Sequence, residues 1–180
     1  MYLEYSLSEN DFLKSQLYSA SKSKIVIKQR RRTFIILIVM FLVFLVSSYI
    51  NQNRFPYLDL LFYCLFLIGY KIYEPIRYKK HYKKFINHTH KEKFGLKCKI
   101  NFTEDQIIEE SVLGESKINL NSLSEINEIQ DYYFLRLITS ESLIIPKNAI
   151  KDIKQFQLKM DTLKTKFNIV ENIDLDWSWK

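Results

Sequence analysis

Residues 33–50 read TFIILIVMFLVFLVSSYI, a run of 18 residues without a charged side chain. As an α-helix this stretch is about 27 Å long, close to the thickness of the hydrocarbon core of a bilayer. A helix that is apolar on every side needs either lipid or a large surrounding protein. The rest of the 180-residue chain is too short to provide the latter. The stretch therefore predicts a transmembrane helix rather than a buried core helix.

A second apolar stretch follows after a short connection. Residues 57–73 read YLDLLFYCLFLIGYKIY, with an uncharged run at 60–70 between Asp59 and Lys71. End charges of this kind reach the interface, and tyrosines suit the interfacial aromatic belt. The connection 51–56, NQNRFP, is rich in turn formers. We expect a two-helix transmembrane hairpin over residues 33–73, with spans at 33–50 and 56–73.

Charge is distributed unevenly along the chain. Residues 1–93 contain 16 Lys and Arg against 6 Asp and Glu, whereas residues 94–180 contain 11 against 14. Basic residues precede the first span and follow the second, and the connection has Arg54 alone. By the positive-inside rule, both termini are cytoplasmic. The chain is therefore predicted to be an integral, multi-pass cell membrane protein whose partner is the lipid bilayer.

The segment before the first span, residues 1–32, is predicted to be cytoplasmic. Residues 2–7, YLEYSL, alternate apolar and polar like a short strand. Ser8 is a suitable helix cap and Asp11 suits a first turn. We expect a helix that continues from here through the basic run at 22–32 into the membrane.

Residues 74–94 form a basic stem after the second span. Pro75 is expected to kink or restart the helix. The residues with candidate contacts to the membrane surface are Arg77, Tyr78, Lys79, Lys80, Tyr82, Lys83 and Lys84. A basic amphipathic helix beside a membrane favours anionic headgroups. The alternative is that the apolar face packs on the following domain while the lysines set topology. Because topology already explains the charges, we expect no nucleic acid partner.

Alternation with period two begins near Gly95 and predicts a small antiparallel β domain over residues 95–167. Strands are expected at 96–102, 106–110, 115–120, 132–138 and 143–146. Residues 123–130 are either a strand with a bulge or a short helix. An amphipathic helix from near Asn148 to Phe167 closes the domain. The acidic tail 168–180 contains two tryptophans and either packs back, lies at the interface or binds a partner.

The sequence lacks the motifs of catalysis. It has no glycine-rich phosphate loop, no nucleophile elbow and no paired histidines at helical spacing. All three histidines, His81, His88 and His90, lie in the stem without a familiar metal-ligand spacing. We therefore expect a protein that is not an enzyme and has neither a cofactor nor a metal.

Residues 123–129, LSEINEI, are followed by YYFL at 132–135 and LIIPK at 143–147. This pattern, with the opening YSLSEND at 5–11, resembles the YcxB-like family of bacterial membrane proteins. Leu123 stands where that family often has a tryptophan. The resemblance implies a fold like that of pleckstrin-homology (PH) domains for the C-terminal domain, and it implies no catalytic residues.

Together these observations predict an α+β membrane protein with a transmembrane hairpin, a PH-like β domain and a C-terminal helix. The leading hypothesis is a membrane-anchored binding protein that recognises a protein partner, a second copy of itself or anionic lipid headgroups at the cytoplasmic face. The alternative is an immunity-type protein that protects its cell from a membrane-targeting toxin. A toxin gene beside its own gene would favour the alternative.

Overall fold

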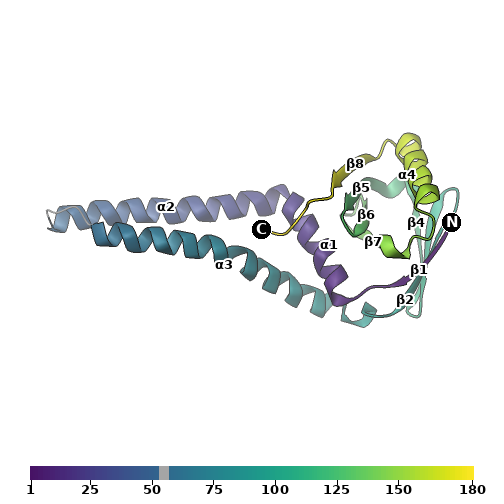
Figure 1. The fold of residues 1–180 in the computed structure, drawn as a ribbon, viewed down its shortest axis with the longest axis horizontal. Coiled ribbons are helices and arrows are strands. Elements are labelled where there is room, and N and C mark those ends of the chain that lie inside the picture. Colours follow the sequence, from purple (N-terminus) through teal and green to yellow (C-terminus); the bar gives the residue numbers. More distant parts are fainter. Residues whose placement is uncertain (53–56) are drawn as a thin grey trace. The chain divides into compact units, whose positions relative to one another are not determined.

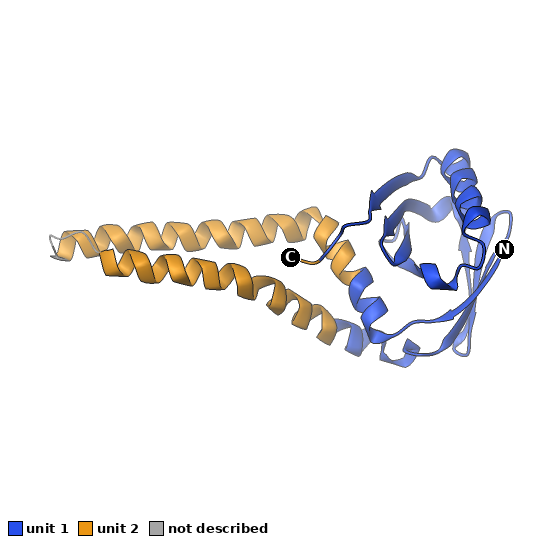
Figure 2. Cartoon of the chain, in the orientation of Figure 1, with its two compact units in different colours: residues 1–15, 85–178 blue, residues 16–84, 179–180 orange. Residues whose placement is uncertain are grey.

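The computed structural model describes residues 1–52 and 57–180 (Figure 1). The predicted connection around Arg54 lies outside these residues. The chain forms two compact units (Figure 2). Unit 1 contains residues 1–15 and 85–178, and unit 2 contains residues 16–84 and 179–180. Unit 1 is therefore assembled from two parts of the chain that flank the long helices in the sequence.

The first sheet of unit 1 joins the start of the chain to its second half. Its strand order is β1-β2-β3-β4, and all its pairings are antiparallel. The strands are β1 (Tyr2–Ser6), β2 (Lys97–Phe102), β3 (Gln106–Ser111) and β4 (Gly114–Asn119). In β2 the side chains alternate strictly between exposed and buried. The apolar and polar residues that alternate in this sequence therefore point to the buried and the exposed face of the sheet, respectively.

The second sheet has the order β7-β6-β5-β8. Its strands are β5 (Leu123–Ile129), β6 (Tyr132–Leu137), β7 (Ser142–Pro146) and β8 (Val170–Asp174). The register shifts between Leu123 and Glu125, so the strand with a bulge is the correct alternative for this segment. β8 pairs with β5 in parallel, so the prediction of a tail without a strand over residues 168–180 is wrong for this segment.

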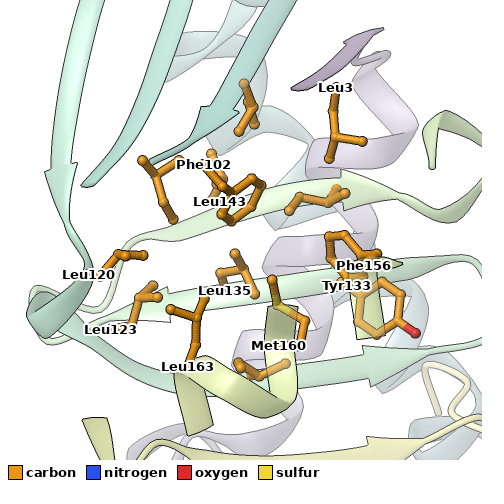
Figure 3. Packing of buried hydrophobic residues seen from close by; sticks show 14 of the residues in the cluster. Leu3, Phe102, Leu120, Leu123, Tyr133, Leu135, Leu143, Phe156, Met160 and Leu163 are labelled. Carbon is orange, nitrogen blue, oxygen red and sulfur yellow. The ribbon is translucent and has the colours of Figure 1, made fainter. Parts of the chain in front are cut away.

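Helix α4 (Ile153–Phe167) supplies one side of the core of unit 1. Its buried Phe156, Met160 and Leu163 belong to one cluster with residues of both sheets, among them Leu3 and Leu135 (Figure 3). The helix begins later than the predicted start near Asn148, where residues 147–149 form a short 3₁₀ turn instead.

The ends of α4 explain where this helix starts and stops. The Asp152 side chain accepts a hydrogen bond from the backbone N–H of Gln155 at 3.0 Å, which caps the first turn. Asn168 ends the helix with a left-handed φ of 52°, a conformation that Asn tolerates well.

Unit 2 is built on two long helices, α2 (Lys24–Gln52) and α3 (Tyr57–Thr89). The expected continuous helix from Ser8 into the apolar run is wrong, because α1 (Glu9–Lys22) ends before Ser23 and α2 begins after it. Pro75 does not restart the second helix, since α3 runs through it. The basic run before the first apolar stretch and most of the basic stem are thus parts of α2 and α3.

α2 and α3 pack in antiparallel fashion. The Tyr63 ring stacks on Phe41 with 3.7 Å between ring centroids. Nearer the connection, the Ser48 hydroxyl donates to Asp59 Oδ2 at 3.1 Å. Among the described residues, one helix, Lys24–Asn51, is long and apolar enough to cross a membrane by length and composition. α3 does not meet that measure, so the structure supports the predicted hairpin only in its first helix.

Candidate functional site

The basic residues of unit 2 gather toward the ends of α2 and α3 that lie away from the connection. Those with exposed side chains before the first apolar stretch or after Lys71 are Lys24, Lys28, Arg31 and Arg32 on α2, and Arg77, Lys79, Lys80, Lys83 and Lys84 on α3. We call this set the basic collar. Because the two helices are antiparallel, the residues before the first apolar stretch and those after the second lie toward the same end of the pair. Five of the seven residues predicted to contact a membrane surface belong to the collar.

The two tyrosines of that prediction, Tyr78 and Tyr82, are half-buried. The Tyr78 ring contacts the guanidinium carbon of Arg30 at 5.6 Å and the ring of Trp179 at 6.2 Å between centroids. Tyr82 lies 6.3 Å from Tyr78, and its partial burial raises the pKa of its hydroxyl above the ordinary value. Tyr78 therefore packs against Arg30 and Trp179, which the helical spacing of the apolar residues did not predict.

An ion pair between α2 and α3 lies beside Tyr78. Arg30 Nη2 donates to Glu74 Oε2 at 3.1 Å, and Lys71 Nζ lies 4.0 Å from the same oxygen. Glu74 is only 2% exposed, whereas a quarter of the Arg30 side chain remains exposed. A carboxylate buried to this degree is costly unless it is paired and hydrogen-bonded. The Glu74 pair therefore fixes how the two helices face each other at this level.

Residues 179–180 complete this cluster. The Trp179 indole Nε1 donates to the backbone oxygen of Pro75 at 2.9 Å, and the Arg30 guanidinium lies 5.3 Å from the Trp179 ring. Arg30 Nη2 also donates to the backbone oxygen of Lys180 at 3.0 Å. Of the three alternatives for the tail, packing back onto the chain is the one that describes Trp179.

The polar residues around the turn between β5 and β6 hold unit 1 together. Lys147 Nζ lies 2.6 Å from Glu128 Oε1, and it also lies over the Tyr133 ring at 5.1 Å. Burial, followed by the charge of Glu128, raises the pKa of Tyr133 to about 12. Nearby, Tyr132 donates to Asp11, and Lys14 forms an ion pair with Asp131 at 2.9 Å. These contacts connect β5 and β6 with Lys147 and with the start of α1, and they stabilise the packing of unit 1.

The stem histidines are placed apart. His90 stacks on Phe12 with 5.1 Å between centroids, and burial lowers the pKa of its imidazole. His81 and His88 are exposed. Within residues 1–52 and 57–180, no three His, Cys, Asp or Glu side chains are arranged to hold a metal ion.

Comparison with known proteins gives one match. The model of the YcxB-like protein family matches residues 102–160, from the end of β2 into α4. The predicted resemblance to that family is confirmed over this segment, which contains the motif residues between 123 and 147 but not the opening residues 5–11. No curated protein and no solved structure matches the chain.

Proposed function

We propose that this chain, YcxB-like over residues 102–160, is a two-span membrane protein that uses its basic collar to bind anionic lipid headgroups at the cytoplasmic face. Its β domain is then a PH-like, non-enzymatic binding module held at that surface. The observation that carries the proposal is the joint position of the collar, which lies where the apolar parts of α2 and α3 both give way to charged sequence.

The assembly of unit 1 supports two membrane crossings. β1 precedes the long helices and β2 follows them, yet the two strands pair along their whole length. If the helical segment enters a membrane, this pairing favours both of its ends on the same side, and therefore two crossings rather than one. If α2 crosses, α3 must bring the chain back. Residues 57–73 are the remaining apolar stretch for that return.

The surfaces of the two helices support the same conclusion. Large apolar side chains point outward from both, including Val39, Met40 and Val43 on α2 and Leu61, Phe62 and Leu65 on α3, all more than half exposed. Moving one such side chain from water into hydrocarbon contributes about 1.5–3 kcal/mol. Two helices with this surface are far more stable in lipid than in water.

The charge of the collar supports both the proposed orientation of the helices in the membrane and anionic lipid as the ligand. Cytoplasmic ends of membrane helices are enriched in Lys and Arg, and the cytoplasmic leaflet is the one that carries anionic lipid. Each Lys or Arg near such a surface contributes about 1 kcal/mol of attraction. This arrangement favours both termini and all of unit 1 on the cytoplasmic side.

The strand order supports the PH-like description. β1 to β7 follow one another with antiparallel pairing in a sheet of four and a sheet of three, after which α4 packs on the core. β8 adds a fourth strand to the second sheet. Fold alone assigns no ligand, so the proposed headgroup binding rests on the collar.

The test compares two sets of three lysines. The full chain is reconstituted with phosphatidylglycerol and phosphatidylcholine, and spin-labelled lipids give its relative binding constant for the two lipids. Replacing Lys79, Lys80 and Lys84 of the collar by Gln is expected to reduce the preference for phosphatidylglycerol several-fold. The matched control replaces Lys99, Lys151 and Lys154, which are equally exposed but lie in unit 1. An unchanged preference in the collar variant, or an equal loss in the control, would contradict the proposal.

A further inference from the structure

Arg30 differs from its basic neighbours on α2. Lys28, Arg31 and Arg32 are exposed, whereas Arg30 is partly covered and already bonded. One of its nitrogens donates both to Glu74 and to the Lys180 backbone oxygen, while its guanidinium carbon lies over the Trp179 ring. Trp179 and Lys180 thus contact the Arg30 guanidinium, which would otherwise be exposed like the basic side chains of the collar.

The position of Arg30 on α2 suits a lipid phosphate. It precedes Thr33, where the uncharged run starts, by three residues, or about 4.5 Å along the helix axis. If the run begins at the edge of the hydrocarbon, Arg30 lies at the depth of the headgroups. A guanidinium presents a fork of donors that matches phosphate oxygens, and the phosphate of an anionic lipid, unlike that of phosphatidylcholine, has no choline cation to neutralise it.

We infer that Arg30 is a site for the phosphate group of an anionic lipid, and that Trp179 and Lys180 occupy this site in cis and compete with the lipid. The inference rests on the proposed function. When a phosphate oxygen replaces the Lys180 backbone oxygen on Arg30, the residues that lose contacts are Trp179 and Lys180. Glu74 retains Lys71 and Arg30 as its partners.

The tail and a lipid phosphate each offer contacts that the other lacks. A lipid phosphate is a charged acceptor, and hydrogen bonds between ionised partners are among the stronger ones. The tail has an indole hydrogen bond to Pro75 and ring contacts with Arg30 and Tyr78 besides its oxygen on Arg30. An increase in anionic lipid should therefore release the tail, changing the ratio of released to docked tail by about fivefold.

Tryptophan fluorescence measures the release directly. Trp177 and Trp179 are the two tryptophans of the chain, so Trp177→Phe leaves Trp179 as the reporter. The full-length variant is placed in vesicles of phosphatidylcholine alone or mixed with an equal part of phosphatidylglycerol. Acrylamide, a neutral quencher, is expected to quench Trp179 more strongly in the mixed vesicles. Inorganic phosphate added to the neutral vesicles should not reproduce this effect, and release by phosphate would overturn the assignment to lipid.

Two variants separate Arg30 from charge in general. Arg30→Gln should make quenching independent of lipid composition, whereas the matched Arg31→Gln, which removes an exposed charge next to it, should preserve the dependence. Independently, Trp179→Ala should increase the preference for phosphatidylglycerol in the spin-label measurement, because it frees Arg30. If the Trp177→Phe protein shows the same quenching in both vesicles while the three-lysine variant still loses its preference, the inference fails and the proposed function stands. If the protein shows no preference for phosphatidylglycerol at all, the proposed function itself fails.

Discussion

Tyr5 in β1 lies opposite Cys98 in β2, although α1, α2 and α3 separate these residues in the sequence. The Tyr5 hydroxyl also donates to the backbone oxygen of Ile144 in β7 at 2.6 Å. The first strand is therefore bonded to both sheets of unit 1. If α2 crosses a membrane as proposed, the chain must return to the side where Tyr5 lies.

This requirement gives a topology prediction. Asn51, at the far end of α2, and Glu141, between β6 and β7, are both exposed. In a Cys64→Ala background, Asn51→Cys should react with an impermeant maleimide on intact cells. Glu141→Cys should react only after permeabilisation. Labelling of Glu141→Cys on intact cells would contradict the two-span arrangement.

Cys98 can remain in that background because it is buried, 8% exposed, with its thiol held protonated. Burial, followed by the charge and the hydrogen bond of Glu109, raises the pKa of Cys98 from 9.0 to about 12. Maleimides react with the thiolate. The native chain with Cys64→Ala alone should therefore stay unlabelled even after permeabilisation, which provides the blank for the topology experiment.

The same thiol makes stability depend on alkaline pH. Above pH 9.0 the unfolded chain releases the Cys98 proton while the folded protein retains it, so rising pH favours unfolding. The contribution is complete below pH 9.0 and is lost as the pH approaches about 12. The free energy of unfolding should fall by up to about 1.4 kcal/mol per pH unit more steeply than in Cys98→Ala. Parallel pH curves for the two proteins would contradict the prediction.

The core of unit 1 should depend on Phe156. This side chain is fully buried, 4.8 Å from the Tyr133 ring and 6.3 Å from the Phe102 ring between centroids. Phe156→Ala is expected to lower the free energy of unfolding by about 3–5 kcal/mol. Leu158→Ala on the exposed side of α4 should change it by less than about 0.5 kcal/mol. Near-ultraviolet circular dichroism during denaturation of the full chain in micelles measures both.

The buried ion pair of unit 2 should behave asymmetrically. Arg30→Gln leaves the nearly inaccessible Glu74 carboxylate with Lys71 alone, whereas Glu74→Gln leaves a cation that is still partly exposed to water. The first substitution should therefore be the more destabilising. The double variant should be more stable than the two separate losses predict, with a coupling of about 1–3 kcal/mol. Additive losses on unfolding in mixed micelles would show that the pair contributes nothing.

Local patterns in the sequence were sufficient for most of the strands of unit 1. β2 and β6 follow from alternating or concentrated apolar residues, and the turns between strands follow from Gly and polar residues. β8 could not be predicted in this way, because its apolar Val170 and Ile173 are exposed. It is held instead by its pairing with β5 and by the amide of Asn172, which donates to the buried Asn127 at 2.9 Å. Such partners become visible only when distant parts of the chain are brought together.

The sequence predicted the positive charge of the candidate site but not the contacts among its side chains. The lysines of the collar are visible in the sequence as a basic stem. By contrast, nothing in the local pattern joins Trp179 to Arg30 or identifies Glu74 as buried. Helix propensity also fails at Pro75, where the packing of a long helix outweighs the cost of a missing hydrogen bond.

The insertion of α2 and α3 between β1 and β2 sets an order of events during synthesis. β1 leaves the ribosome first and has no partner until β2 has been translated, after both long helices. Pairing over such a distance is slow, and an unpaired strand is open to wrong partners. The first sheet therefore closes only after both long helices have been synthesised. A chain in which β2 fails to reach β1 would keep both strand edges exposed, which is the kind of surface that chaperones and proteases recognise.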